Sequence, residues 1–310
     1  MATVWVLGAK GFIGQYLARF LADDGHRILG LGHGLWPEDL AAETGVTYWV
    51  NGEIDSANLS QLLKVGGAPA TIYHLAGGSS VGLSMQSPLE DFQRTVSTAA
   101  ALLEWVRAFQ PATKIVSVSS AAVYGDSSKT MLTEDGEYTP FSPYGFHKRM
   151  LELLCESYVR NFGLKVAIVR LFSIYGAGLQ KQLLWDVGGR LIGRPQHLTM
   201  HGTGAELRDW LHVTDAVRLL AAAGQYDGED FMILNGGTGM GTSVATVLDM
   251  VCAAWGWSPE ISFSGDRRTG DPINLVADVT RVNHLLDVRP QMQLADGIAD
   301  YVRWLKEVRA

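Results

Sequence analysis

The sequence predicts an α/β fold, in which a doubly wound parallel sheet forms a large core and a smaller mixed α/β lobe follows it. Two observations lead to this prediction. Short apolar segments rich in β-branched residues alternate with segments whose apolar residues recur at helical spacing, which is the pattern of a parallel sheet covered by helices on both faces. The first apolar segment also runs directly into a glycine-rich turn, Gly8–Gly14.

The strands of the sheet are predicted from six apolar segments: Val4–Leu7, Arg27–Leu31, Thr47–Val50, Thr71–Leu75, Lys114–Ser119 and Lys165–Leu171. Helices are predicted between them, near residues 13–24, 56–64, 89–109 and 144–162. The third of these helices follows from Phe92, Val96 and Leu103, which recur at helical spacing after an acidic start. Beyond Tyr175 the alternation ends, and helices are expected again near residues 214–224, 242–255 and 293–308.

The length of 310 residues suits two subdomains rather than two independent domains. We expect a Rossmann-type core at residues 1–172 and a substrate-binding lobe at residues 173–310 that is partly interleaved with the core. Cys155 and Cys252 lie in apolar helical segments, so buried thiols are expected rather than a disulfide or a nucleophile.

Charge and hydropathy exclude several classes of partner. A net charge of −7 argues against a surface for nucleic acid or for anionic membranes. No apolar run reaches about 18 residues, the length of a membrane-spanning helix. Strand residues begin by Thr3, which leaves no room for a signal peptide, and we expect a cytoplasmic protein. No metal site is expected.

The turn Gly8–Gly14 follows a predicted strand and opens a predicted helix. Glycines at Gly8, Gly11 and Gly14 let the backbone approach a pyrophosphate, and the helix start offers it free N–H groups and a positive dipole. We therefore expect this turn, including Phe12 and Ile13, to bind a dinucleotide cofactor. A tight connection between strand and helix without a ligand is the other interpretation.

The end of the second strand bears on the choice between NAD and NADP. NAD-selective folds commonly place an acidic residue there to bind the ribose 2′-hydroxyl, whereas this strand ends in Gly32-His33-Gly34. No carboxylate therefore repels a 2′-phosphate, and Lys10, with His33 as a second candidate, could bind one. The sequence favours NADP and leaves NAD possible, and Lys10 could also be a solvated loop lysine.

Tyr144 and Lys148 are four residues apart at a predicted helix start, which puts them on one helical face. A nearby ammonium is expected to lower the tyrosine pKa toward neutrality, so that the phenol exchanges a proton with a sugar or alcohol oxygen. Ser120, at the end of the fifth strand, could bind the same oxygen or could instead satisfy a turn amide. With a dinucleotide-binding turn, these residues indicate redox chemistry at a carbon that bears oxygen.

Six motifs occur together in this chain and make it recognisable: Gly8–Gly14, Tyr73–Gly77, Ser119–Gly125, Ser142–Lys148, Arg170–Gly176 and Arg208–Val213. In their order and spacing the chain resembles the extended short-chain dehydrogenase/reductase family, in its nucleotide-sugar epimerase/dehydratase branch. The resemblance covers nearly the whole chain.

The resemblance implies a role for each matched residue. Ser120, Tyr144 and Lys148 would form the catalytic triad, in which Lys148 also binds the nicotinamide ribose. Substrate contacts would come from Ser120, Ser173 and, at the diphosphate, two arginines, Arg208 and Arg268. The expected cofactor contacts are Gly8, Lys10, Gly11, Phe12, Ile13, Gly14, His33, Glu53 (at the adenine), Leu75, Ala76, Gly77, Tyr144 and Lys148.

Departures from the family pattern restrict which of the family's reactions are expected. Ala121-Ala122 replaces the acid and base that dehydratases carry after the catalytic hydroxyl, so 4,6-dehydration is not expected. Thr95 and Ser173 stand where many members have asparagine, which changes the usual substrate pose.

Three functions remain. The cofactor argument favours an NADP-dependent reductase of a nucleotide-activated 4-keto-(6-deoxy)hexose, with hydride transfer at C4. The alternative is an NAD-dependent nucleotide-sugar 4-epimerase that oxidises C4 transiently. A non-catalytic dinucleotide-binding regulator is a remote third, because a regulator does not need an intact Ser/Tyr/Lys set. The resemblance also implies a homodimer formed through helices 89–109 and 144–162.

Overall fold

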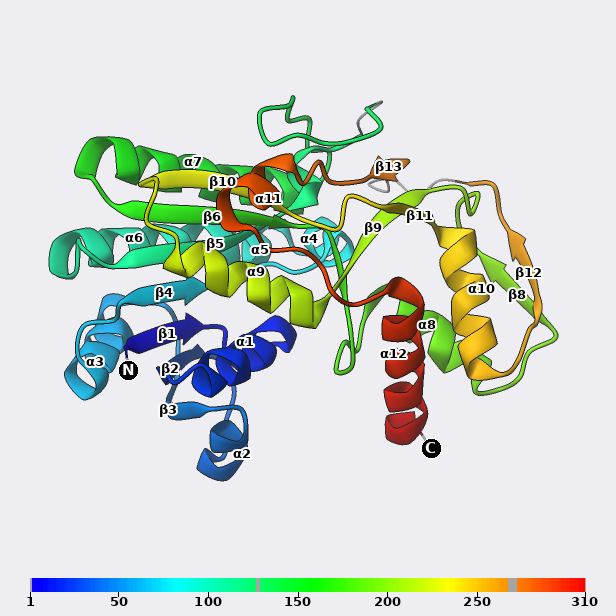
Figure 1. The fold of residues 1–310 in the computed structure, drawn as a ribbon, viewed down its shortest axis with the longest axis horizontal. Helices are drawn as coiled ribbons and strands as arrows, with labels where there is room; N and C mark the ends of the chain where they lie inside the picture. The colour runs from blue at the N-terminus through cyan, green and yellow to red at the C-terminus, as the bar shows by residue number, and fades with distance from the viewer. Residues whose placement is uncertain (1, 127–128, 267–271, 310) are drawn as a thin grey trace.

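A seven-stranded parallel sheet forms the core of the computed structural model, which describes residues 2–126, 129–266 and 272–309 (Figure 1). In spatial order its strands are β10 (Phe231–Gly236), β6 (Lys165–Leu171), β5 (Lys114–Ser120), β4 (Thr71–His74), β1 (Thr3–Leu7), β2 (Arg27–Gly32) and β3 (Val46–Asn51). The strand order reverses between β1 and β4, and the crevice beyond such a reversal is where doubly wound sheets bind ligands. The predicted fold class is confirmed.

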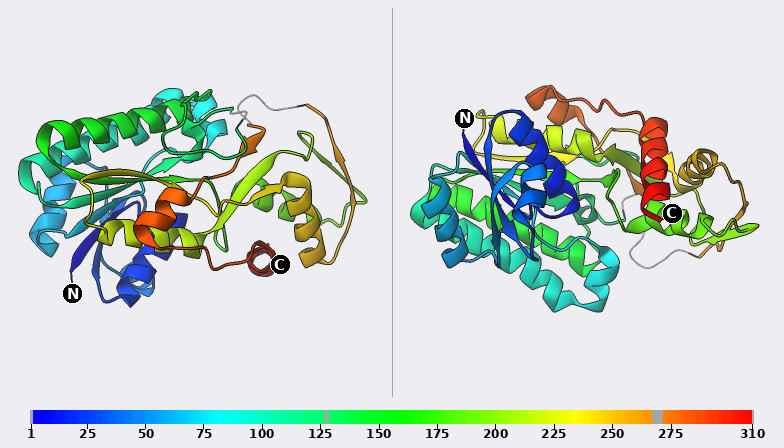
Figure 2. Two further views of the ribbon diagram at one scale, coloured as in Figure 1. Left: turned by 45° about the horizontal axis from the view of Figure 1, so that its top comes forward. Right: turned by 90° about the horizontal axis from the view of Figure 1, so that it is seen from below.

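Helices cover both faces of the sheet because successive strand residues point to opposite sides. Val4 and Val6 pack on one face, and Trp5 and Leu7 pack on the other. The first face is covered by α1 (Phe12–Asp23) and α9 (Val213–Gln225), and the second by α3 (Ser56–Gly66), α6 (Thr98–Phe109) and α7 (Pro143–Phe162). Figure 2 shows α6 and α7 side by side, with α1 on the opposite side of the sheet.

The single helix predicted at 89–109 is divided into three parts. They are α5 (Pro88–Phe92), a π-helical turn η1 (Gln93–Ser97) and α6. Thr95 lies in this turn, is fully buried, and its hydroxyl accepts a hydrogen bond of 2.8 Å from the Gly78 amide. π-helical turns commonly mark functional sites. The spacing of apolar residues did not predict this π-helical turn, since the helical pattern continues on both sides of it.

The smaller lobe has its own core, in which Tyr175, Leu248 and Tyr301 are buried. It contains β7 (Ser173–Tyr175), α8 (Gln182–Leu191), β8 (His197–Met200), β9 (Leu207–His212), β11 (Gly241–Ser243), α10 (Val244–Trp255), β12 (Glu260–Phe263), β13 (Asn274–Leu275) and α12 (Leu294–Arg309). Between β9 and β11 the chain returns to the first sheet as α9 and β10, so the two parts are interleaved. The boundary at residue 172 stays a prediction.

Short elements complete the fold. They are α2 (Glu38–Glu43), α4 (Val81–Gln86), the 3₁₀ turn η2 (Ala121–Val123) and α11 (Thr280–Leu286). Cys155 and Cys252 are buried free thiols, as predicted.

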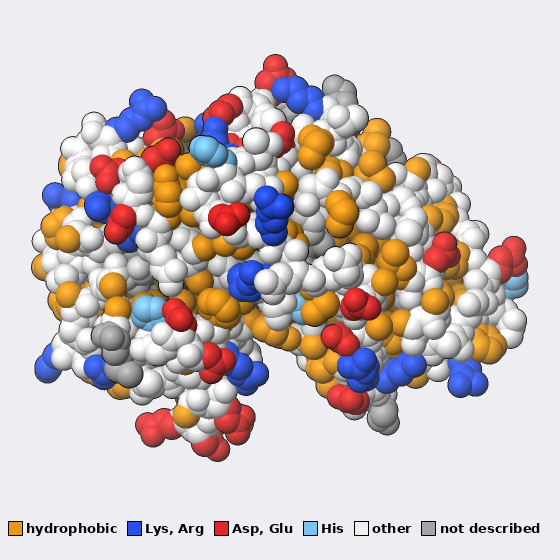
Figure 3. All heavy atoms as spheres, in the orientation of Figure 1, with side chains coloured by type: hydrophobic (Ala, Val, Ile, Leu, Met, Phe, Trp, Pro, Cys, Tyr) orange, Lys and Arg blue, Asp and Glu red, His pale blue; other side chains and the backbone are white. Residues whose placement is uncertain are grey.

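The surface carries mixed charge. On the face in Figure 3, Lys and Arg side chains are interspersed with Asp and Glu, and an indentation separates the core from the lobe. Across the described ranges, every helix is too short or too polar to cross a membrane.

Candidate active site

One cavity of about 1650 Å³ lies beyond the carboxyl ends of the strands and extends to the lobe. Every described residue that the sequence assigned to the site lines it: Gly8, Lys10, Gly11, Phe12, Ile13, Gly14, His33, Glu53, Leu75, Ala76, Gly77, Ser120, Tyr144, Lys148, Ser173 and Arg208. Arg268, the second predicted arginine, lies outside the described residues. The volume exceeds the roughly 300–1,000 Å³ of ordinary ligand pockets, so it has room for two extended ligands.

The glycine turn fits a dinucleotide pyrophosphate. Gly8 has φ +96°, and a Cβ there would lie 3.1 Å from the Ala76 nitrogen. A Cβ on Gly14 would lie 2.2 Å from the Gly8 oxygen, so the first turn of α1 packs directly on the loop. Gly11 precedes α1 without a side-chain cap, which leaves the first amide groups of this helix for a ligand. The residues present therefore suit an anionic group at this position.

At the end of β2, Gly32 stands where NAD-selective folds commonly place a carboxylate, and it packs closely against Trp49. A Cβ on Gly32 would lie 3.0 Å from the Trp49 ring, which occupies the space of a side chain. Lys10 reaches the same loop, and its ammonium donates a 2.6 Å hydrogen bond to the Leu35 carbonyl oxygen. His33 Nε2 lies 3.4 Å from a Glu53 carboxylate oxygen, and both side chains are exposed. A cation and an acidic residue thus share this end of the cavity.

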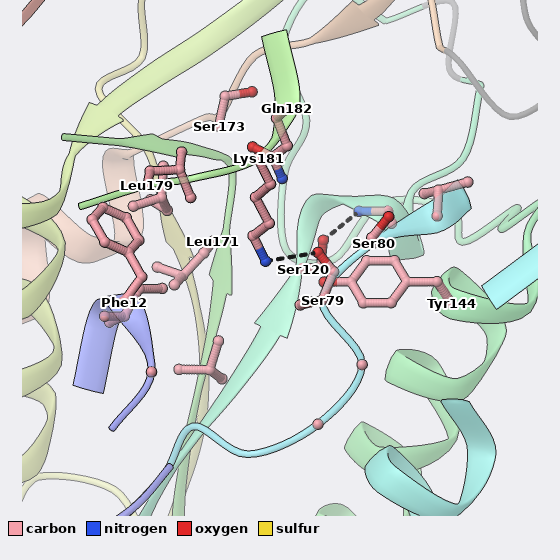
Figure 4. A pocket seen from close by; sticks show the side chains of 18 of the residues that line it. Phe12, Ser79, Ser80, Ser120, Tyr144, Leu171, Ser173, Leu179, Lys181 and Gln182 are labelled. Carbon is pink, nitrogen blue, oxygen red and sulfur yellow. Dashed lines mark hydrogen bonds between the residues drawn. The ribbon is translucent and has the colours of Figure 1, made fainter. Parts of the chain in front are cut away.

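The start of α7 is fixed against the end of β5. The Ser142 hydroxyl caps the helix by accepting from the Gly145 amide at 3.2 Å. A Cβ on Gly145 would lie 2.6 Å from the Ala122 oxygen, so helix and turn are in direct contact. The Tyr144 amide donates to the buried Ser84 hydroxyl at 3.1 Å. These contacts hold Tyr144 beside Ser120 (Figure 4).

The pKa of Tyr144 differs in direction from the sequence-based expectation. Burial raises it above the ordinary value, a hydrogen bond from Ser120 lowers it, and the charge of Asp91 raises it. Burial outweighs any effect of the Lys148 ammonium, which lies 5.8 Å from the centre of the phenol ring. The prediction of a tyrosine pKa near neutrality was therefore wrong for the protein alone. The sequence-based prediction considered the charge of Lys148 but not the burial of the phenol, which disfavours the phenolate.

Lys148 is only 3 % exposed. Its ammonium donates to the Val118 carbonyl oxygen at 3.0 Å, and a Cβ on Gly77 would lie 3.3 Å from the nitrogen. Burial lowers the pKa of Lys148 to about 8, while the charges of Asp91 and Glu152 oppose this shift. The turn after β4 therefore passes directly over the ammonium.

Ser120 makes both contacts that the sequence allowed. Its hydroxyl accepts from the Ala122 amide at 3.2 Å, as a turn-capping serine does. It also hydrogen-bonds Tyr144, which places two hydroxyl groups together at the wall of the cavity. Satisfying the turn does not exclude a contact with a ligand.

A buried ion pair joins the elements that carry Ser120 and Tyr144. Arg170 in β6 donates to both carboxylate oxygens of Glu152 in α7, at 2.9 and 2.8 Å, and both side chains are fully buried. Glu152 also accepts from Ser119 at 2.6 Å and from Arg149 at 3.0 Å. This carboxylate therefore ties α7 to β5 and β6, the elements that carry Tyr144 and Ser120.

The lobe contributes the opposite wall. Ser173 in β7 and Arg208 in β9 both line this wall. The Arg208 guanidinium donates a 2.8 Å hydrogen bond to the Leu207 carbonyl oxygen. Sequence reasoning missed Lys181, Gln182 and Trp210, which also line the cavity. Lys181 follows the Arg170–Gly176 motif closely, and this position was the one signal that could have marked it.

Comparison with known proteins identifies the family. The family model described as the NAD dependent epimerase/dehydratase family matches residues 4–235, most of the chain. The chain belongs to this family. The predicted family resemblance is confirmed.

Relatives and solved structures of this family match along the whole chain. A UDP-glucose 4-epimerase of Azospirillum brasilense is 29% identical, with 95% of this chain and 89% of the relative covered. A UDP-glucuronate 4-epimerase of Thermodesulfobacterium geofontis is 24% identical, over 97% and 95% of the two chains. The structure of MoeE5 in complex with UDP-glucuronic acid and NAD has a TM-score of 0.88 and 29% identity, and 99% of each chain is covered.

Proposed function

We propose that this member of the family is a nicotinamide-dependent UDP-sugar 4-epimerase. The observation that carries the proposal is the set of Ser120, Tyr144 and Lys148 on one cavity wall, next to a turn that suits a dinucleotide. Ala121-Ala122 offers no acid and base for elimination of water, which argues against a dehydratase. Curated relatives with UDP-glucose and UDP-glucuronate 4-epimerase names support the choice. The epimerase alternative thus replaces the reductase as the first proposal.

In this reaction Tyr144 would remove the proton from the sugar C4 hydroxyl and later return it to the same oxygen. Ser120, already bonded to Tyr144, would hold that oxygen in place. Lys148 would bind the cofactor ribose and stabilise the phenolate by its charge. A nicotinamide dinucleotide bound in the cavity supplies a reversible hydride acceptor, positively charged when oxidised. Between the two proton transfers the oxidised sugar would rotate to present its other face to the cofactor, and the wide cavity leaves space for this rotation.

The second candidate is the NADP-dependent 4-keto-sugar reductase. The specific observation in its favour is the end of β2, where Lys10 lies near Gly34 and no carboxylate follows the strand. These residues suit a 2′-phosphate. Against it, MoeE5 and the UDP-glucuronic acid 4-epimerase of Bacillus cereus were solved with NAD. NADP therefore belongs to this second candidate, and NAD to the first.

Product analysis separates the two candidates. The purified protein is incubated with UDP-glucose or UDP-glucuronate, and its retained cofactor is identified after denaturation. We expect interconversion of C4 epimers with retained NAD and no net change in reduced nicotinamide. Tyr144→Phe should lower turnover by about two to four orders of magnitude and leave folding intact. Net oxidation of NADPH by a 4-keto-sugar, without epimerisation, would favour the reductase.

A further inference from the structure

Lys181 is a cavity cation that the catalytic residues do not explain. It comes from the lobe, directly before α8, and its side chain extends across the cavity toward Ser79 and Ser120 (Figure 4). Its ammonium reaches the Ser79 carbonyl oxygen at 3.5 Å, which is at the outer limit of a hydrogen bond. The charge therefore lies beside the predicted acid/base residues rather than at the outer end of the cavity.

No described carboxylate forms an ion pair with Lys181. Arg94 and Arg190, which also line the cavity, are ion-paired with Glu90 and Asp186. Lys10 and Lys148 donate hydrogen bonds of 2.6 and 3.0 Å to backbone carbonyl oxygens, whereas the contact of Lys181 is longer, at 3.5 Å. Burial lowers the pKa of Lys181, and no charged neighbour opposes the shift. A partly buried, unpaired ammonium is costly for the protein alone and becomes favourable when a ligand brings an anion.

The residue after Lys181 has an unfavourable backbone conformation. Gln182 has φ 66°, a left-handed conformation that is unfavourable for a residue other than glycine. The turn at Gln182 begins α8, which has no side-chain cap at its first turn. Strain of this kind persists where the surrounding structure requires it, and it is commonly found at ligand sites.

The structure of a sugar nucleotide limits which of its groups the Lys181 ammonium can contact. In a hexopyranose the substituent on C5 is adjacent to C4, whereas the diphosphate is on C1, across the ring. A cation beside the residues that act at C4 therefore meets the C5 substituent before it meets the diphosphate, which is the expected partner of Arg208. Hydroxymethyl and methyl groups at C5 carry no charge, and a carboxylate does.

We propose that Lys181 binds a carboxylate on C5 of the sugar, so that the preferred substrate is a nucleotide-activated hexuronic acid. The inference rests on the 4-epimerase function proposed above and adds the class of sugar to it. A charge-assisted hydrogen bond in a partly desolvated site is the strong kind, and losing it should reduce affinity about tenfold or more.

Calorimetric binding to the protein with its retained cofactor tests the assignment. UDP-glucuronate, UDP-glucose and UDP are titrated into the wild type, Lys181→Met, Lys181→Arg and, as a control, Lys64→Met, which removes an exposed lysine outside the cavity. We expect the wild type to prefer UDP-glucuronate over UDP-glucose. Lys181→Met should lose affinity for UDP-glucuronate about tenfold or more and bind the other two as before. Lys181→Arg should retain much of the preference, and Lys64→Met all of it.

Two results overturn the assignment. An equal loss of affinity for all three ligands in Lys181→Met would show that the lysine binds the diphosphate. A wild type that binds UDP-glucose more tightly than UDP-glucuronate would show that Lys181 does not select a carboxylate on C5. Because affinity and formation of the C4 epimer are measured in separate experiments, the proposed reaction is judged separately. Lys181-dependent binding of UDP-glucuronate without epimerisation would support the carboxylate site and contradict the epimerase.

Discussion

Tyr144 and Lys148 illustrate what residue spacing predicts and what it leaves out. Their interval of four on a helix was sufficient to predict that both face one site, and both line the cavity. The direction of the tyrosine pKa was not predictable in this way, because it depends on burial and on Asp91, which is distant in sequence. Lys181 was missed for the related reason that its role depends on where the lobe lies.

The buried ammonium of Lys148 should destabilise the fold at neutral pH. Its pKa in the folded protein is about 8, below the ordinary value of 10.5, so the unfolded chain binds more protons between these pH values. The cost is therefore present in full below pH 8 and is relieved as the pH rises toward 10.5. Lys148→Met should be more stable than the wild type at pH 7, by up to roughly 3 kcal/mol, and inactive.

Urea denaturation of both proteins across this pH range measures the effect. The stability difference should shrink as the pH rises above 8. A Lys148→Met variant that is less stable than the wild type at neutral pH, or a difference independent of pH, would show that burial of the charge is not costly here.

At the scale of elements, helical and strand periodicity was a good guide to the core and to the lobe helices α10 and α12, which were expected near residues 242–255 and 293–308. Six of the seven core strands were predicted within about a residue because each is a short apolar run between turns, whereas β10 was not predicted. Helix α8 was missed, since Gly188 and Gly189 interrupt its pattern. A Cβ on Gly188 would lie 2.0 Å from Leu305, so the glycine is needed for contact with α12. Such a contact between distant segments cannot be read from local sequence.

Helix α7 depends on the ion pair that joins it to the sheet. Glu152→Gln keeps the shape of the side chain but leaves the buried Arg170 guanidinium without a counter-charge. We expect a loss of about 3–5 kcal/mol in the free energy of unfolding, the usual cost of breaking a buried pair. The matched control is Glu156→Gln on the same helix, whose partner Arg160 is exposed. It should change stability by about 0.5 kcal/mol or less.

Chemical denaturation at pH 7 compares these two variants. If Glu152→Gln is as stable as Glu156→Gln, the network does not hold α7 against β5 and β6. Loss of stability in Glu152→Gln alone would support the account.

At the scale of the whole molecule, we propose that the protein forms a homodimer through α7 and its neighbours. Phe146, Met150 and Leu153 recur on one face of α7 and are 50, 42 and 48 % exposed. Leu89, at the start of the adjacent α5, is also exposed. An apolar surface of this kind indicates an interface, and the family resemblance implied a dimer through these helices.

Sedimentation velocity tests this interface. Leu153→Glu should convert a wild-type dimer to a monomer, because it places a charge in the apolar contact. Val308→Glu alters a similarly exposed residue on α12 and should leave the dimer intact. A monomeric wild type, or a dimeric Leu153→Glu variant, would argue against α7 as the interface.

The central claim for the molecule is transient oxidation at C4 with return of the same hydrogen. It is tested by UDP-glucose and UDP-glucuronate that carry deuterium at C4, incubated with the protein and its retained cofactor. The account predicts that the C4 epimer forms with its deuterium still on C4 and that none appears in the free nicotinamide pool. Loss of deuterium from C4, or its accumulation in released cofactor, would contradict the account.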